Sequence, residues 1–207
     1  DIDPMMRRTE KRAIPMGKVS PESALFFGIT ISVMGVAWFY FMSNEVAAFW
    51  SAFSILFYVL IYSMWLKRST PQNIVIGGIA GSTPPVIGWA ASVEGLSISN
   101  NSLEASIESL FDLGSPIPWF MFILIFLWTP PHFWALALYK SKEYAEVGVP
   151  MLPNVKGPER TITEMKVYSI LLIMLSFFAP LSFGEIEVNE RDYHVLSWTI
   201  VGLSIWY

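Results

Sequence analysis

Residues Trp128 to Pro153, WTPPHFWALALYKSKEYAEVGVPMLP, contain the change of pattern that decides the fold. The stretch begins inside a long apolar run, which Pro130-Pro131 is expected to break, and His132 follows the break at once. The apolar pattern ends at Lys140. Since a helix rises about 1.5 Å per residue, His132 would lie roughly 12 Å deeper in the membrane than Lys140. Polar groups at such a depth usually face a cavity or a polar partner, so we expect a cavity beside His132.

The composition is that of a membrane protein. Of the 207 residues, 54% are hydrophobic and only 14% are charged, whereas soluble domains carry about 25% charged residues. The chain has no cysteine, which excludes disulfides, thiolate catalysis and sulfur-ligated metals. The net charge of -4 indicates little about binding partners, because positive charge in a membrane protein is distributed unequally between the two sides of the membrane. We expect the lipid bilayer as a partner and no nucleic acid.

Five apolar runs without Asp, Glu, Lys or Arg are each long enough to cross a bilayer, which needs about 20 helical residues. They are Ser23–Met42, Val46–Leu66, Asn73–Ser92, Pro116–Tyr139 and Val167–Gly184. A sixth run, Tyr193–Tyr207, would reach only roughly 22 Å at helical rise. The pattern predicts an all-α polytopic membrane bundle around a central cavity, with five complete transmembrane helices and part of a sixth. Because the chain starts in a loop and ends inside an apolar run, we expect a fragment.

Loop charge predicts the orientation in the membrane. The loops 1–22, 67–72 and 140–166 hold 12 of the 13 Lys and Arg residues, and the alternate loops hold only Arg191. Because cytoplasmic loops are enriched in Lys and Arg, the first set should face the cytoplasm or its organellar equivalent.

Two longer loops have different characters. Val93–Ser115 is acidic, and its run SLEASIESLF is either a short amphipathic helix on the outer surface or a solvated connector. Lys140–Glu164 contains several turn-forming Gly and Pro residues but keeps apolar side chains. Those apolar residues, Val147, Val149, Met151 and Leu152, suit a loop that folds back onto the helix ends as a lid.

The sequence STPP at 82–85 is echoed by WTPP at 128–131. Paired proline-broken spans can mark a binding site between repeat halves. The alternative, which stays open, is that each proline pair only kinks its helix.

Carboxylates accompany the cationic loops, with Asp1 and Asp3 in the first and Glu143 in the third. Mg²⁺ is usually held by one or two carboxylates together with substrate phosphates. Carboxylates and cations above an apolar shaft would suit a phosphorylated lipid, with its charged head at the mouth and its tail in the membrane. For any single lysine, ordinary charge bias remains the alternative.

DIDPMMRRTEKR, at 1–12, is similar to the end of the Asp-rich first motif of the intramembrane UbiA-type prenyltransferases. The preceding Asn and Asp of that motif would fall before position 1. YSMWLKRSTPQNIVIGGIAGSTPPVIGW, at 62–89, and the stretch WTPPHFWALALYKSKEYAEVGVPMLP resemble the haem-farnesylating branch of that superfamily. The resemblance covers nearly the whole chain. It departs at Pro4, at Ala13, where an Arg-Pro pair is usual, and in the loop 93–115.

The resemblance implies a nine-helix bundle, of which residues 1–207 would be a single domain supplying helices three to seven and part of eight. It implies transfer of a farnesyl group from farnesyl diphosphate to haem b, with water addition, and a dependence on Mg²⁺. The membrane would be the bacterial inner membrane or its mitochondrial counterpart. Oxidase-assembly factors and haem A synthase would be its protein partners.

The resemblance also suggests roles for individual residues. Asp3 and Asp1 would bind metal, and Glu143 stands where relatives have a second acidic motif. Residues holding the diphosphate would be Arg8, Arg12, Lys67, Arg68 and Lys140. Residues beside the haem and prenyl groups would be His132, Trp128, Phe133, Trp134 and Asn73. The catalytic set would be Asp3, Lys67, Arg68 and His132.

Three roles stay open for His132: an axial contact to haem iron, a polar wall of the diphosphate site, or a structural hydrogen bond to a neighbouring helix. Gly77, Gly78 and Gly81 are expected to permit close helix packing.

Two other functions are weighed against haem farnesylation. A related prenyltransferase acting on a quinone precursor or a chlorophyll-type acceptor would carry an Asp-x-x-x-Asp pattern where this chain has the stretch around His132 and Lys140. A transporter would place several ionisable residues in its spans, whereas the five runs offer only His132.

Overall fold

A computed structural model describes residues 3–6 and 9–179 of the chain, and within them it is helical with no β-strand. Four helical segments are long and apolar enough to cross a membrane, and they match the first four predicted runs. The segments are α1 (Pro21–Met42), α2 (Glu45–Leu56) continued by the π-helical η2 (Phe57–Leu66) and α3 (Lys67–Ser69), α4 (Asn73–Ser82) followed by α5 (Pro84–Ser92), and α7 (Ile117–Tyr139).

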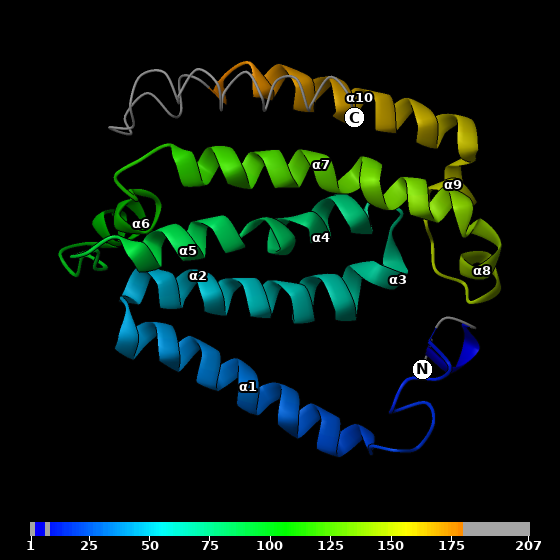
Figure 1. Cartoon of the computed structure of the whole chain (residues 1–207), viewed down its shortest axis with the longest axis horizontal. Coiled ribbons are helices and arrows are strands. Elements are labelled where there is room, and N and C mark those ends of the chain that lie inside the picture. Colours follow the sequence, from blue (N-terminus) through cyan, green and yellow to red (C-terminus); the bar gives the residue numbers. More distant parts are fainter. Residues whose placement is uncertain (1–2, 7–8, 180–207) are drawn as a thin grey trace, which may run out of the picture.

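These segments lie side by side in chain order, and α10 (Pro158–Ser176) packs along α7 (Figure 1). Helix α10 begins at Pro158, nine residues before the fifth predicted apolar run, Val167–Gly184. Its first turns are polar and carry an ion pair of 2.6 Å between Arg160 and Glu164. Hydropathy marks the apolar part of a helix and not its first residue, which explains the difference. The remainder of the fifth run and the whole sixth run lie outside the described residues.

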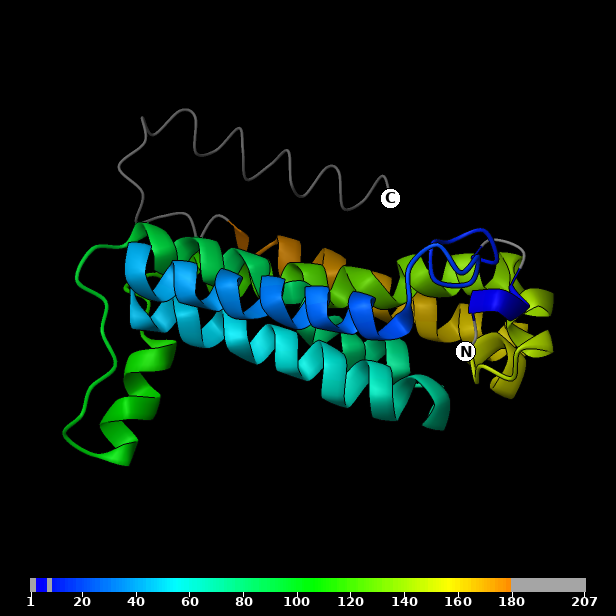
Figure 2. The same cartoon turned by 90° about the horizontal axis from the view of Figure 1, so that it is seen from below.

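The bundle has two distinct ends (Figures 1 and 2). One end carries the N-terminal turn η1 (Asp3–Met5), α3, α8 (Ser141–Glu146) and α9 (Leu152–Lys156). The other end carries α6 (Leu103–Phe111), which runs across the direction of the long helices in Figure 2. The segments rich in Lys and Arg therefore share one end, as the alternation of loop charge predicted. We call it the cationic end.

The two Pro-Pro pairs behave differently. Helix α7 continues through Pro130 and Pro131, so the predicted break there is wrong. Prolines lack an N–H, but packing against the neighbouring helices α4 and α10 can hold such a helix together in a membrane protein. The chain does break before Pro84, where Thr83 Oγ1 lies 2.7 Å from Ser54 Oγ and 2.8 Å from the Ala80 carbonyl oxygen. These contacts satisfy polar groups at the break.

The segment between α7 and α10 forms the predicted lid. Val149, Met151 and Leu152 are buried in one cluster with Ile74 of α4 and Trp134 of α7. The apolar residues retained in this loop therefore fix it against the cationic end of the bundle.

Helix α1 packs against α2, and none of its residues is buried within the protein. With 22 residues it extends about 33 Å, enough for the hydrocarbon layer. Its apolar side chains are therefore suited to lipid contact.

Candidate functional site

A cavity of about 690 Å³ lies between α1, α2, η2, α4 and α7, within the apolar part of the bundle. We call it the central cavity. Aromatic side chains form much of its wall, with Tyr58 and Tyr62 from η2 and Trp128 and Phe133 from α7. Its volume falls in the range of about 300–1,000 Å³ that is usual for small-molecule sites. The predicted membrane-embedded cavity is therefore present.

Three glycines of α4 also line the central cavity, namely Gly77, Gly78 and Gly81. A Cβ at Gly77 would overlap the Tyr62 ring, whose Cε2 would lie 2.8 Å away. A Cβ at Gly78 would contact Thr129 Cγ2 at 3.4 Å. The expected close packing is therefore found at Gly77 and Gly78 but not at Gly81, where a Cβ would meet no described atom within 4 Å and the missing side chain leaves open space.

The serine and threonine hydroxyl groups of the cavity wall form hydrogen bonds within the protein. Ser54 Oγ lies 3.1 Å from the Ala80 carbonyl oxygen, and Thr129 Oγ1 donates to the Ile125 carbonyl oxygen at 2.7 Å. Among the described lining residues, only Tyr58 and Tyr62 carry an ionisable group. The central cavity therefore suits an apolar or aromatic ligand.

His132 lies beside this cavity but is not one of its lining residues. Its ring stacks on Trp128, with centroids 4.2 Å apart and an interplanar angle of 20°, and it meets Phe133 edge-on at 5.5 Å. The side chain of His132 is exposed on the protein surface. Two of the predicted haem and prenyl residues, Trp128 and Phe133, thus line the cavity, and His132 supports them from outside.

Trp134 and Asn73, the other two predicted haem and prenyl residues, do not line the central cavity. Trp134 is fully buried in the lid cluster and packs edge-on against Tyr168. Asn73 is buried at the start of α4. Within the described part of the chain, neither Trp134 Nε1 nor Asn73 Nδ2 has a hydrogen-bond acceptor. Each therefore retains a donor that an ordered water or a ligand oxygen could satisfy.

Among the described residues of the cationic end, two ion pairs involve predicted site residues. Arg12 Nη1 donates to Asp3 Oδ2 at 3.1 Å, and Lys140 Nζ donates to Glu143 Oε1 at 2.7 Å. Asp1 and Arg8 lie outside the described residues. Both pairs lie at the same end of the bundle. Each pair joins two residues of one segment, so neither pair links the first cationic segment to the third.

Lys67 and Arg68 form the start of α3, directly after η2. Tyr62 of the central cavity lies on the same continuous helix, little more than one turn before Lys67. Ile74 of α4 lines the central cavity and also belongs to the buried cluster that holds the lid residues. The cationic end and the lid are therefore next to the cavity.

No group of three or more His, Asp or Glu side chains suited to a metal is found in the ranges 3–6 and 9–179. Asp3 is partly exposed and is held on one oxygen by Arg12. Mg²⁺ often takes one or two carboxylates, with substrate phosphates and water completing its shell. Asp3 fits that mode as a single carboxylate ligand.

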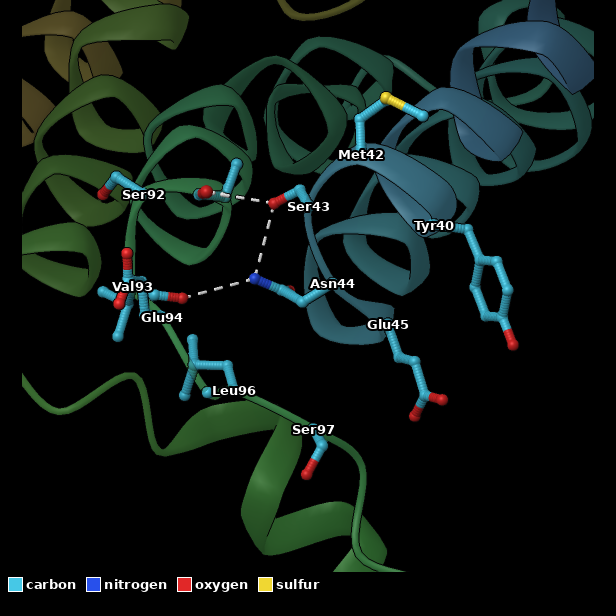
Figure 3. Close-up of a pocket in the computed structure, with 12 residues that line it drawn as sticks. Tyr40, Met42, Ser43, Asn44, Glu45, Ser92, Val93, Glu94, Leu96 and Ser97 are labelled. Carbon is cyan, nitrogen blue, oxygen red and sulfur yellow. Dashed lines mark hydrogen bonds between the residues drawn. The ribbon is translucent and has the colours of Figure 1, made fainter.

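A second hollow, of about 600 Å³, lies at the opposite end of the bundle, where the turn after α1 meets the segment after α5 (Figure 3). Ser43 Oγ donates to the Ala91 carbonyl oxygen at 3.0 Å, and Asn44 Nδ2 donates to that of Ala90 at 2.6 Å. The charged side chains lining this hollow are Glu45 and Glu94. An anionic head group is therefore suited to the cationic end and not to this hollow.

Sequence reasoning missed the tyrosine wall. Tyr58 and Tyr62 are four residues apart and their rings pair at 5.3 Å, but this spacing is common in helices. Nothing in the sequence shows that the Tyr62 ring lies over Gly77.

The helices and the embedded cavity define an integral membrane protein. The chain belongs to the UbiA prenyltransferase family, whose model matches residues 1–206. It is 46% identical to a protein from Beijerinckia indica named protoheme IX farnesyltransferase, over 91% of this chain and 55% of that protein. It is 48% identical to protoheme IX farnesyltransferase 1 of Mesorhizobium japonicum, over 100% of this chain and 60% of that protein.

A protoheme IX farnesyltransferase of Sinorhizobium fredii is 48% identical over 100% of this chain and 58% of that protein. The chain thus spans somewhat more than half the length of these curated relatives. No solved structure matches it.

Proposed function

We propose that the full-length protein transfers the farnesyl group of farnesyl diphosphate to a vinyl group of haem b, giving haem O and diphosphate. The observation that carries this proposal is an apolar, aromatic cavity next to a cationic end, in a chain nearly half identical to proteins named protoheme IX farnesyltransferase. Such an arrangement can accept an apolar tail and an anionic head together.

The first step breaks the bond between farnesyl C1 and the diphosphate oxygen, so the leaving group's negative charge must be stabilised. Fixed charges stabilise it most strongly where water is excluded. Arg12, Lys67, Arg68 and Lys140, with Arg8, would hold the diphosphate; arginine suits bidentate phosphate contacts. Asp3, with Asp1 and Glu143, would hold Mg²⁺, which when bound supplies positive charge to the phosphates.

The second step forms a carbon–carbon bond between the haem vinyl group and farnesyl C1. An alkene needs no general base to attack a carbocation, and the described residues of the cavity wall include no Asp, Glu, Lys or His. Water then captures the cation on the porphyrin side and releases a proton. Trp128 and Phe133 would stabilise cationic charge through their ring faces, by about 0.5–2 kcal/mol each.

The remaining site residues would act from nearby. His132 would hold Trp128 through ring stacking, and its exposed imidazole leaves both an iron contact and a contact to the diphosphate open. Asn73 and Trp134 would offer their unpaired donors to a substrate oxygen or an ordered water.

The cationic end would face the cytoplasm of a bacterium or the matrix of a mitochondrion, since it holds the excess of Lys and Arg. The membrane would be the corresponding inner membrane. Oxidase-assembly factors or haem A synthase would receive the product.

Pigment analysis tests the proposed reaction. In a cell that lacks its own haem O synthase, the full-length gene should restore haem O, measured by chromatography and mass spectrometry of extracted haems. The parent strain with an empty vector is the control. Unmodified haem b alone, with the full-length protein present in the membrane, would refute the proposal.

Removing the two charges next to the central cavity should weaken binding of the prenyl donor. Replacing both Lys67 and Arg68 with alanine should raise the KM for farnesyl diphosphate by about tenfold or more, since charge-assisted contacts contribute about 1.5–3 kcal/mol each. The measurement is haem O formation at varied farnesyl diphosphate and saturating haem b. Replacing exposed Lys18 with alanine is a control for lost positive charge. A change confined to haem affinity would reassign both residues to the haem.

A further inference from the structure

The outer helix α6 is attached to the membrane bundle by three tryptophans from three different spans. Trp50 Nε1 of α2 donates to the carbonyl oxygen of Leu110 at 2.9 Å, and Trp119 Nε1 of α7 donates to that of Phe111 at 2.9 Å. Trp89 Nε1 of α5 donates to the carbonyl oxygen of Leu113 at 3.1 Å. The last carbonyls of a helix have no partner within it, so these indoles both satisfy and position the end of α6.

Ring contacts strengthen the attachment. Phe111 stacks on Trp119 with centroids 5.4 Å apart, and Trp50 meets both rings edge-on at 5.4 Å. Leu110 of α6 is also buried. The position of α6 relative to the spans is therefore fixed at its C-terminal end.

One face of this fixed helix is apolar and uncovered. Leu103, Ile107 and Phe111 recur every four residues and so share a face of the helix. Leu103 is 78% exposed and Ile107 50% exposed. Glu104 and Glu108 form the adjoining face, which leaves a narrow apolar stripe bordered by carboxylates.

The position of α6 along the membrane normal and its direction indicate what covers the apolar stripe of Leu103 and Ile107. Its C-terminal end is fixed beside Trp89 and Trp119, which lie close to span ends at Ser92 and Ile117, and tryptophan concentrates at membrane–water boundaries. The helix runs across the long helices and projects past the side of the bundle (Figure 2). It therefore lies along the plane of a bilayer whose normal follows the bundle. The ring cluster of Phe111 and Trp50 also continues to Phe49, an exposed residue of a membrane-spanning segment.

We propose that α6 is an interfacial helix, which lies in the lipid head-group layer at the end of the bundle opposite the cationic end. Leu103 and Ile107 enter the boundary between head groups and acyl chains, and Glu104 and Glu108 face water. Helices of this kind insert their apolar face about 5–10 Å into that boundary. The occupant of the stripe is a lipid surface, continuous with the lipid that surrounds the spans.

Spin labels test this proposal in the full-length protein reconstituted into phosphatidylcholine nanodiscs. The described chain has no cysteine, so single cysteines at Leu103, Ile107 and Glu108 can be labelled once any cysteine elsewhere in the full-length protein is replaced. Labels at Leu103 and Ile107 should be severalfold more accessible to dissolved oxygen, relative to a water-soluble nickel chelate, than a label at Glu108. Glu108 is the matched control, because it is also exposed and lies on the same helix.

Two outcomes would overturn the proposal. Equal access of the nickel chelate to all three labels would show a solvated connector. Protection of Leu103 and Ile107 from both oxygen and nickel would show that protein covers the stripe, from another segment of the full-length chain or from a second molecule. Replacing Trp119 with phenylalanine removes one hydrogen bond to α6 and should increase the mobility of the Ile107 label.

Discussion

Replacing Asp3 with alanine in the full-length protein should lower the rate of haem O formation by about 100-fold or more, which is typical when one preorganised electrostatic group is lost from an active site. The carboxylate is partly exposed at the cationic end and is oriented by Arg12 at 3.1 Å. Its loss should leave haem b bound, because the cavity wall is built by other segments. Turnover is measured by chromatography of the haems, and haem binding by absorbance titration.

Glu10 supplies the control for this substitution. It is an exposed carboxylate of the same segment, and replacing it with alanine should leave turnover near that of the parent protein. Asp3→Asn should behave like Asp3→Ala, because it keeps the shape and removes the charge. Unchanged turnover in Asp3→Ala would remove Asp3 from the diphosphate and metal site.

Replacing Gly77 with alanine should narrow the central cavity and weaken haem binding by roughly 5- to 150-fold. The new Cβ would overlap the Tyr62 ring, which must then move, and overpacking of this kind costs about 1–3 kcal/mol. Each 1.4 kcal/mol corresponds to a tenfold change in affinity. Absorbance titration of the full-length protein with haem b measures the effect, and thermal unfolding shows how much of the cost is taken from stability.

Two further variants make this result specific. A Cβ at Gly88 would meet no atom of the described residues within 4 Å, so Gly88→Ala should bind haem as the parent does. Adding Tyr62→Ala to Gly77→Ala removes the overlapping ring and should recover part of the lost affinity or stability. If Gly77→Ala alone matches the parent in both measurements, the placement of Tyr62 over Gly77 does not shape the site.

The spans were predictable because hydrophobicity and charge are local properties of the chain. The first four runs and the grouping of Lys and Arg at one end follow from apolar stretches separated by loops of alternating charge. The lid was predictable for a related reason, since four apolar residues within a polar loop need a surface on which to be buried.

The detail of the site was less predictable, because it depends on contacts between distant segments. Pro130-Pro131 suggested a break, but helix packing holds α7 together across it. Trp134 resembles Trp128 in sequence context, yet it faces the lid and Trp128 faces the cavity. The two residues are separated by six positions, which places them on different faces of one helix.

The burial of the lid's apolar residues affects how molecules can enter and leave the protein. Lifting the lid would expose Val149, Met151 and Leu152, and each buried side chain of this size contributes about 1.5–3 kcal/mol. A fully open lid would therefore be rare. Since each 1.4 kcal/mol changes an equilibrium constant tenfold, fewer than about one molecule in a thousand would have an open lid at equilibrium. Apolar reactants and products would therefore exchange more readily by lateral passage between the helices into the bilayer than through the lid into water.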